Sequence, residues 1–470
     1  MSLYFYNTLG HKRQEFVPLR PGQAGLYTCG PTVYNYAHIG NLRAYAFEDL
    51  LKRTLIFFGY KVRHVMNLTD VDDKTIRGSQ EAGKSLDEFT RKYKDAFFED
   101  IEKLRFLPAD HYPAATEHIP EMLEIIAILM EKGIAYQAED KSIYFSIAKW
   151  PRYGQLVNID PAQLRCAGRV KHDEYAKESA ADFALWKAWD EADGEVYWDS
   201  PWGRGRPGWH LECSAMSSRY LGKTFDLHCG GIDNIFPHHE DEIAQSEAAN
   251  DQPFVNYWLH CAHLMVEGEK MAKSAGNFYT LREILDKGYK GREVRWVLIG
   301  THYRQSLNFS FKALDEARTA LQRIDAFQLR LRENAGNADT GCAAAQAIVD
   351  RCLAAFRDAL GDDLNISTAL AAFFDFIRSA NRLMDQEQIG GNVVTLLQEA
   401  MQRMDSVLAV CEPDEEADEA LPAEIAALLE ERQAARKAKD WVKADQLRDE
   451  LASLGWALED TPKGPRLLRK

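Results

Sequence analysis

The sequence feature that most constrains the fold is a strand, turn, helix and strand pattern near the N-terminus. Residues 24–29 form a short strand-like run that ends at Gly30 and Pro31. Apolar residues then recur at helical spacing between residues 39 and 57, and residues 61–68 form a second strand-like run. Two strands joined by a helix predict a βαβ crossover, so we expect an α/β fold.

The turn into the predicted helix carries the residues His38, Ile39, Gly40 and Asn41. A glycine at this position lets a nucleotide approach the backbone closely. The N-terminus of a helix, together with a histidine donor, favours phosphate. The turn therefore indicates a nucleotide-binding site.

A second charged motif spans residues 269–277 and carries Lys270 and Lys273. It lies between a predicted strand at residues 257–266 and a predicted helix at residues 281–287. Transfer of a nucleotidyl group builds negative charge on the leaving pyrophosphate, which positioned lysines stabilise. Taken alone, the segment is typical of a solvated loop, but its pairing with the turn at His38 favours nucleotidyl transfer.

Four side chains are candidate zinc ligands: Cys29, Cys213, His238 and Glu242. Zinc takes thiolate, imidazole and carboxylate ligands, and zinc with an open position can bind the thiol of a small substrate. A helix beginning at Pro237 would place His238 and Glu242, four residues apart, on one face. The positions of these residues alone do not favour zinc over ordinary thiols and buried side chains, but the motifs around all four do, and with them the pattern predicts a site that recognises cysteine.

Composition and length limit the class of protein. The chain has 470 residues, a length typical of three or four domains, and a net charge of −15, which argues against indiscriminate coating of nucleic acid. No secretory leader is visible at residues 1–10, and the longest apolar stretch, residues 122–130, is short of the ~20 that a spanning helix needs. We expect a soluble cytoplasmic protein, whose remaining cysteines are ordinary reduced thiols: Cys166, Cys229, Cys261, Cys342, Cys352 and Cys411.

Charge is distributed unevenly near the C-terminus. Residues 412–431 contain nine acidic residues and no lysine or arginine, which predicts a solvated linker. Residues 432–470 contain ten basic and six acidic residues, which indicates a small basic module. For residues 432–454 alone, a charged solvated helix is the alternative interpretation, and Trp441 is as typical of a core residue as of a stacking platform.

Together these motifs resemble a known family. Residues 38–41 resemble the His-Ile-Gly-His signature of class I aminoacyl-tRNA synthetases, and residues 270–274 resemble their Lys-Met-Ser-Lys-Ser signature. Further motifs narrow the resemblance to the cysteinyl-tRNA synthetases and extend it over nearly the whole chain. They are Cys-Gly-Pro-Thr-Val-Tyr from Cys29, Asn-Leu-Thr-Asp-Val-Asp-Asp-Lys from Asn67, Arg-Pro-Gly-Trp-His-Leu-Glu-Cys from Arg206, Phe-Pro-His-His-Glu from Phe236, and the segment from Lys439 to Thr461.

The resemblance implies roles for individual residues. Cys29, Cys213, His238 and Glu242 correspond to the family's zinc ligands, with zinc taking the substrate thiolate directly. The residues implied to contact ATP and the adenylate are Pro31, His38, Gly40, Asn41, Gly231, Asp233, Lys270 and Lys273. Of these, His38, Lys270 and Lys273 are implied to be catalytic. The residues implied to contact cysteine are Gly30, Thr69 and Trp209. The implied cofactors are one Zn²⁺ per chain and Mg²⁺ with ATP, and the implied partners are L-cysteine, ATP and tRNA(Cys), bound by a monomer.

The expected architecture is a doubly wound, Rossmann-like catalytic domain followed by a helical bundle and an anticodon-binding module. The expected boundaries are residues 1–114 for the first half of the catalytic domain, 115–205 for an insertion that holds the tRNA acceptor end, 206–299 for the second half with the lysine loop, 300–411 for the bundle, 412–431 for the acidic linker and 432–470 for the C-terminal module, where Trp441 is the candidate tRNA contact.

The chain departs from the family pattern at several positions, and two other functions stay open. The departures are Asn41, Ala44, Ala272, Cys229 and the segment 363–367. Asn41 keeps an amide donor but cannot become cationic. The first alternative is a cysteine ligase of the mycothiol-pathway type, which acts on an amino sugar and lacks the anticodon module. The second is a non-catalytic tRNA- or zinc-binding paralogue.

Overall fold

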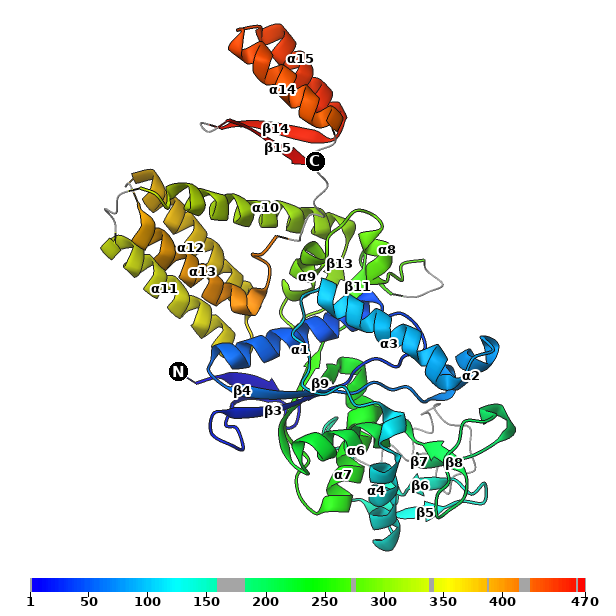
Figure 1. The fold of residues 1–470 in the computed structure, drawn as a ribbon. Coiled ribbons are helices and arrows are strands. Elements are labelled where there is room, and N and C mark those ends of the chain that lie inside the picture. Colours follow the sequence, from blue (N-terminus) through cyan, green and yellow to red (C-terminus); the bar gives the residue numbers. More distant parts are fainter. Residues whose placement is uncertain are drawn as a thin grey trace. The chain divides into compact units, whose positions relative to one another are not determined.

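The computed structural model describes residues 2–158, 182–271, 276–337, 342–386, 389–413, 423–461 and 464–469. The chain forms two compact units, Met1–Glu412 and Pro413–Lys470. The larger unit contains the α/β region, an inserted sheet and a helical bundle (Figure 1). The two units are described separately.

A four-stranded parallel sheet lies at the centre of the larger unit. Its order is β10-β9-β3-β4, and every neighbouring pair is parallel. Helix α1 connects β3 to β4, so the βαβ crossover predicted from the sequence is confirmed. The bounds are β3 Gln23–Thr28, α1 Ile39–Phe57, β4 Lys61–Met66, β9 Phe225–Gly231 and β10 Val255–Cys261.

Helices cover both faces of this sheet, which makes the fold doubly wound. Helices α1 and α9 lie on one face, and α6 and α7 lie on the other (Figure 1). Strand order reverses between β3 and β9, and in such sheets ligands bind outside the carboxyl ends of the strands at the reversal. The bounds are α2 Asp73–Glu81, α3 Leu86–Lys103, α6 Trp209–Leu221, α7 Glu240–Asn250, α8 Leu281–Leu285 and α9 Gly291–Ile299.

The insertion between the two halves of the α/β region forms its own antiparallel sheet, of order β5-β6-β7-β8. Helix α4 packs against α6 and α7, so the insertion shares a core with the lower face of the central sheet. The bounds are η1 Ala115–Glu117, α4 Ile119–Glu131, β5 Ala135–Gln137, β6 Ile143–Phe145, η2 Ile147–Lys149, β7 Phe183–Ala188, η3 Glu191–Asp193 and β8 Gly205–Pro207.

Three elements differ from the sequence prediction. The strand predicted at residues 257–266 is two strands, because β10 stays in the parallel sheet whereas β11 leaves it to pair with β12 and β13. The helix predicted at residues 281–287 ends at Leu285. The helix predicted to begin at Pro237 begins with a π turn, after which α7 starts at Glu240. The bounds are β1 Tyr4–Asn7, β2 Lys12–Glu15, η4 Ile232–Asn234, η5 Ile235–His239, β11 Leu264–Val266, β12 Glu269–Lys270 and β13 Leu307–Phe309.

A helical bundle completes the larger unit. The helical spacing seen in the sequence is the buried stripe of α10, which runs through Leu314, Ala317, Leu321, Ile324 and Phe327. Helix α13 packs against α1, so one core joins the bundle to the upper face of the sheet. The bounds are α10 Phe311–Asn334, α11 Cys342–Gly361, α12 Ile366–Gln386 and α13 Gly391–Leu408.

The smaller unit consists of two helices and a hairpin: α14 Ala423–Lys437, α15 Trp441–Ser453, β14 Trp456–Thr461 and β15 Gly464–Arg469. The single helix considered for residues 432–454 is broken, because Lys439 has a φ of +60° and Asp440 caps α15. The last part of the predicted acidic linker, from Ala423 onward, is helical.

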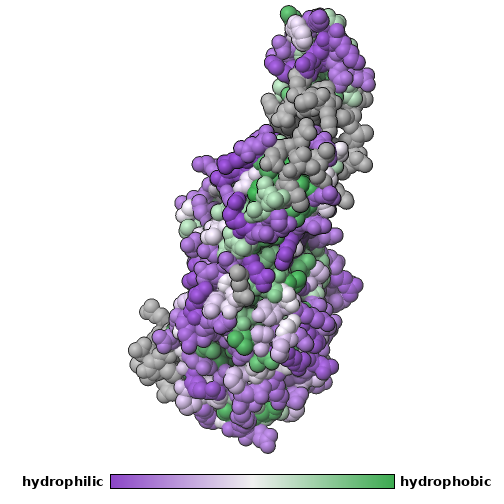
Figure 2. Space-filling view, turned by 90° about the vertical axis from the view of Figure 1, so that its left-hand side faces the viewer, coloured by the Kyte–Doolittle hydropathy of each residue, from purple (hydrophilic) through white to green (hydrophobic). Residues whose placement is uncertain are grey.

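The face of the molecule drawn in Figure 2 is mostly hydrophilic, and its hydrophobic residues occur in small groups. This agrees with apolar side chains that are largely collected in the internal cores. Within the described ranges, no helix has the length and apolar character needed to cross a membrane.

Candidate active site

A cluster of thiol, imidazole and carboxylate groups lies at the reversal of strand order. Cys29 directly follows β3, while His238, His239 and Glu242 come from η5 and the start of α7. One ligand atom from each of these four residues lies within 4.8 Å of the others. Strand β3 and helix α7, far apart in the sequence, therefore place a metal-binding set of atoms at one point.

The fourth predicted ligand, Cys213 on α6, adjoins this cluster. Its Sγ lies 3.6 Å from Nε2 of His238, and its thiol is hydrogen-bonded to that of Cys29. Nε2 of His239 lies 3.3 Å from Sγ of Cys29. The four predicted side chains are thus brought together, and His239 is a fifth that the sequence prediction omitted.

The two oxygens of Glu242 have different surroundings. Oε2 lies 3.0 Å from Nε2 of His228 and is hydrogen-bonded to it. Oε1 lies 3.0 Å from Nε2 of His238, but in a geometry that forms no hydrogen bond, and it is fully buried. A buried acceptor without a hydrogen bond is costly, whereas a carboxylate oxygen and an imidazole nitrogen that share a cation are satisfied. The donor set therefore fits a divalent metal.

The protonation states of the cluster also favour a cation. Burial raises the pKa of Glu242 well above its ordinary value, and the hydrogen bond to Cys213 together with burial does the same for the pKa of Cys29. Burial lowers the pKa of His238 well below its ordinary value. These shifts favour the protonated thiols and carboxylate, and a bound metal would offset the cost of deprotonating them.

Outer hydrogen bonds fix the orientation of His238. Its Nδ1 lies 2.8 Å from Nδ1 of His210, and Nε2 of His210 lies 3.2 Å from a carboxylate oxygen of Asp241. The hydroxyl of Tyr153 donates to the same carboxylate group. Such outer partners orient a histidine ligand and set its tautomer.

A second chain of hydrogen bonds reaches Cys29 from the other side. Oγ1 of Thr8 lies 2.7 Å from Nδ1 of His260, and Nε2 of His260 lies 2.8 Å from Nδ1 of His239. His239 in turn contacts the thiol of Cys29. The chain connects the N-terminal hairpin to the cluster through buried groups.

The predicted cysteine-binding residues border the cluster. The ring of Trp209 stacks on that of His238, with centroids 4.1 Å apart, and 43% of Trp209 is exposed. The hydroxyl of Thr69 donates to Glu212 at 3.1 Å and is buried. At Gly30, a Cβ would lie 1.8 Å from the backbone oxygen of Asn67, so only glycine fits there.

The predicted nucleotide residues lie at the N-terminus of α1. Nδ1 of His38 accepts hydrogen bonds from the backbone N–H groups of Gly40 and Asn41, at 3.1 and 3.3 Å. Oδ1 of Asn41 accepts the backbone N–H of His38 at 3.2 Å, which completes a capping box. A Cβ on Gly40 would lie 3.0 Å from the side chain of Met271, so the lysine segment approaches this turn closely.

The remaining predicted contacts are placed as follows. Lys270 is exposed at the end of β12, and Lys273 lies outside the described residues. Gly231 ends β9, its N–H donates to Asn234 at 3.1 Å, and Asp233 is exposed in the next turn. The backbone oxygen of Pro31 accepts the N–H of Thr69 at 3.1 Å.

Comparison with known families agrees with this arrangement. The family model for the class I (C) tRNA synthetase catalytic domain matches residues 15–319. The DALR domain matches residues 355–412, and the cysteinyl-tRNA ligase anticodon binding domain matches residues 418–465. Proteins named cysteine–tRNA ligase from Chlamydia caviae and Protochlamydia amoebophila are 50% and 49% identical to this chain, over 99% and 100% of it and 98% of each relative.

The chain belongs to the cysteinyl-tRNA synthetase family. This synthetase is therefore an aminoacyl-tRNA ligase, and its fold agrees with solved class I synthetases. The Mycobacterium tuberculosis methionyl-tRNA synthetase with methionyl-adenylate matches with a TM-score of 0.59 and 15% identity, over 83% of this chain and 90% of that one. The LeuRS–tRNA–LeuAMS complex of Agrobacterium radiobacter K84 matches with a TM-score of 0.61 and 11% identity, over 84% of each chain.

Sequence reasoning about the synthetase omitted the buried histidines around the predicted ligands. His239 is adjacent to a predicted ligand, and His260 lies near the carboxyl end of β10, beside β9. Because parallel strands end at one edge of a sheet, the position of His260 was a usable signal. In the smaller unit, the predicted tRNA contact Trp441 is the first residue of α15 and is 57% exposed, which leaves its ring available for stacking.

Proposed function

We propose that this chain joins L-cysteine to tRNA(Cys) in two steps. Cysteine and ATP first give cysteinyl-adenylate and pyrophosphate, and the cysteinyl group then moves to the terminal adenosine of the tRNA. The observation that carries this proposal is the convergence of Cys29, Cys213, His238 and Glu242 beside Trp209. The names of the relatives supply the substrates, and the cluster supplies a chemical reason for choosing cysteine.

The proposed metal is one Zn²⁺ per chain, held by the two thiols with His238 and Glu242. When bound, zinc supplies a position that favours a thiolate over a neutral hydroxyl and offers nothing to a methyl group. A metal is needed for this selectivity. A pocket that recognises shape alone discriminates between substrates that differ in one small group only about 10- to 200-fold. Trp209, stacked on His238, forms the wall beside this position.

The chain's own groups supply the rest of the first step. The positive end of the α1 dipole and the ring of His38 face the phosphates in this proposal, with Mg²⁺ accompanying ATP. Lys270 and Lys273 stabilise the charge that develops on pyrophosphate. Gly231 and Asp233 hold the ribose of the adenylate. Thr69 and Gly30 position the amino acid, a role supported by the hydrogen bonds that fix Thr69 beside the cluster.

The second step requires the tRNA to contact parts of the chain outside the central sheet. The insertion at residues 115–205 holds the acceptor end in this proposal, and the smaller unit reads the anticodon, with Trp441 as a stacking residue. Support comes from the match of residues 418–465 to an anticodon binding domain, which a ligase acting on an amino sugar would not need. We expect a monomer that acts in the cytoplasm.

The deciding experiment is cysteine-dependent exchange of pyrophosphate into ATP, followed by aminoacylation of a tRNA(Cys) transcript. We expect exchange with cysteine and none above background with serine or alanine. Aminoacylation should require the tRNA(Cys) transcript and not proceed with an unrelated tRNA. Exchange without any transfer to tRNA would contradict the proposal and favour an amino-sugar ligase.

A further inference from the structure

Arg282, the second residue of α8, is anchored on α3 by three hydrogen-bond acceptors. Its Nη1 donates to Oδ1 of Asp100 at 2.6 Å, and its Nη2 donates to Oε2 of Glu99 at 2.6 Å. Nη2 also donates to the backbone oxygen of Ala96 at 3.3 Å. The planar guanidinium can bridge several acceptors at once in this way, which a single ammonium group does less well. Arg282 therefore ties the start of α8 to α3.

The same guanidinium contacts the segment that enters the turn at His38. It lies over the ring of Tyr36, 4.9 Å from the centroid, where the face of the ring attracts a cation. Tyr93 of α3 meets the Tyr36 ring edge-on, with centroids 5.3 Å apart. Tyr36 precedes His38 by only two residues. The entry to the turn is thus held by α3 and by Arg282 together.

The segment that leads into α8 covers the other side of the turn. Thr280 forms an antiparallel bridge with His38, and the backbone N–H of Ile39 donates to the oxygen of Tyr279 at 2.8 Å. The ring of Phe278 meets that of His38 edge-on, with centroids 4.8 Å apart. The position of α8 against α3 therefore bears directly on the position of the His38 ring.

The ion pair with Asp100 favours one position of α8. Asp100 is fully buried, and among the described residues its Oδ2 has no hydrogen-bond partner. Burial raises the pKa of Asp100 to about 6, and the charge of Arg282 opposes this shift. A buried carboxylate is costly unless it is paired, so a displaced α8 would leave this charge without its partner. Glu99 is exposed and contributes less to this preference.

Attachment of α8 to the core does not depend on Arg282. Leu281 and Ile284 of the same helix are fully buried in the core that joins the sheet to the bundle. Burial of two large apolar side chains is enough to hold a short helix against a core, but apolar contacts are not directional. The polar contacts of Arg282 therefore determine orientation more than attachment.

We propose that Arg282 is a positioning residue for the first step of the reaction, because it fixes the ring of His38 from both sides. On one side it holds Tyr36, and on the other it holds the segment that ends at Thr280. The inference rests on the proposed function, in which the His38 ring faces the phosphates of ATP. It deepens that function by giving a role to a side chain that makes no contact with substrate.

The test compares Arg282→Gln with a matched control in the full chain. The control is Arg91→Gln, which removes the same charge from an exposed ion pair with Asp87 on α3. Pyrophosphate exchange gives kcat and the KM for cysteine. We expect kcat of Arg282→Gln to fall about 10- to 100-fold, because a displacement of about 1 Å in a reacting group costs up to about 100-fold. The control should keep the wild-type kcat.

The KM for cysteine separates positioning from general loosening of the fold. The cluster around Cys29 is built from other elements, so this KM should stay within about twofold of wild type while kcat falls. Arg282→Gln leaves Asp100 without its partner, which is enough to prevent folding of some proteins. The double variant Arg282→Gln with Asp100→Asn removes that buried charge and should show the same fall in kcat. Thermal melting establishes which variants are folded at the assay temperature.

A wild-type kcat in a folded Arg282→Gln or double variant would overturn the inference. An equal fall in kcat for the Arg91→Gln control would also overturn it, and so would a rise in the KM for cysteine as large as the fall in kcat. Failure of the proposed function looks different, because the wild type itself would then lack cysteine-dependent exchange.

Discussion

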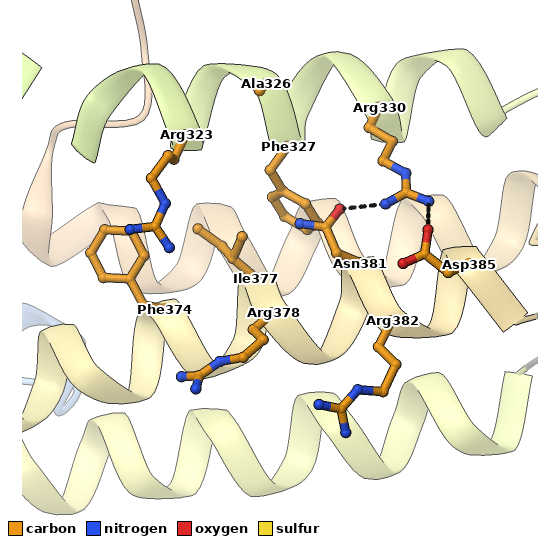
Figure 3. A pocket seen from close by; sticks show the side chains of 10 residues that line it. All are labelled: Arg323, Ala326, Phe327, Arg330, Phe374, Ile377, Arg378, Asn381, Arg382 and Asp385. Atoms are coloured by element: carbon orange, nitrogen blue, oxygen red, sulfur yellow. Dashed lines mark hydrogen bonds and ion pairs between the residues drawn. The ribbon is translucent and has the colours of Figure 1, made fainter. Parts of the chain in front are cut away.

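The cluster around Cys29, Cys213, His238 and Glu242 and the open groove between α10 and α12 (Figure 3) both gather reactive or charged side chains, but the chain builds them in opposite ways. The charged residues that line the groove are Arg323, Arg330, Arg378, Arg382 and Asp385. The cluster draws on residues from β3, α6, β9, β10 and the start of α7, nearly all of them buried and tied together by hydrogen bonds. The groove draws on two helices, and most of its charged groups are exposed. A buried network transmits a single change to all its members, whereas exposed cations act almost independently.

This difference predicts large, non-additive effects of substitutions at the cluster and small, nearly additive effects at the groove. The hydrogen bonds of the buried cluster hold it in one arrangement, which suits the proposed selection of a small thiol. We make four predictions about the cluster and its surroundings, ordered from the largest expected effect to the smallest.

The largest effect is expected for Cys213→Ser. Serine keeps the size of the side chain but replaces a thiolate ligand with a hydroxyl, which zinc binds poorly. We expect loss of bound zinc and a fall in cysteine-dependent pyrophosphate exchange of more than about 100-fold, above the usual cost of losing an outer partner. Metal analysis and exchange kinetics check this together. Full zinc content with unchanged affinity for cysteine would show that Cys213 is not a ligand.

The degree to which each region was predictable follows the same contrast. The βαβ unit and the buried stripe of α10 were predicted correctly because helical and strand periodicity is local. Each predicted ligand stood in a short motif. His228, His239 and His260 were missed because their contacts join β9, η5 and β10, which only the folded sheet brings together. The groove was missed although the spacing of Arg323 and Arg330 is local, since nothing local identifies the helix opposite.

The second-largest effect is expected when the smaller unit is removed, because the proposed catalytic residues all lie in the larger unit. A cut after Glu412 removes that unit without dividing a helix, whereas a cut after Glu431 would fall inside α14. Exchange of pyrophosphate should stay within about twofold of wild type, because every proposed catalytic residue precedes the cut. Aminoacylation at limiting tRNA should fall by about 10-fold or more, equivalent to at least about 1.4 kcal/mol of binding. Equal aminoacylation by the full and shortened chains would remove the anticodon role of the smaller unit.

A smaller effect is expected at the outer edge of the cluster. Thr8→Val removes the hydroxyl that contacts His260, and one neutral hydrogen bond contributes about 1 kcal/mol. Zinc affinity, measured by competition with a chelator, should weaken about fivefold, which is the same free energy expressed as a ratio. Thr8→Ser keeps the hydroxyl and should restore the wild-type value. If the Thr8→Val and Thr8→Ser variants have the same zinc affinity, the hydrogen bonds through His260 do not orient the cluster.

The smallest effect is expected for Asn41→His, at the opposite end of the site. Oδ1 of Asn41 accepts the N–H of His38 and so completes the cap of α1, and a neutral imidazole can accept the same bond. The backbone N–H of residue 41, which donates to His38, is unchanged by the substitution. Histidine is also the residue found in the signature that this turn resembles. We therefore expect pyrophosphate exchange within about threefold of wild type, because losing a cap outright costs about 1 kcal/mol and this substitution retains an acceptor. Exchange kinetics at saturating and limiting ATP check this, and a loss confined to limiting ATP would mean that the Asn41 amide itself contacts the nucleotide.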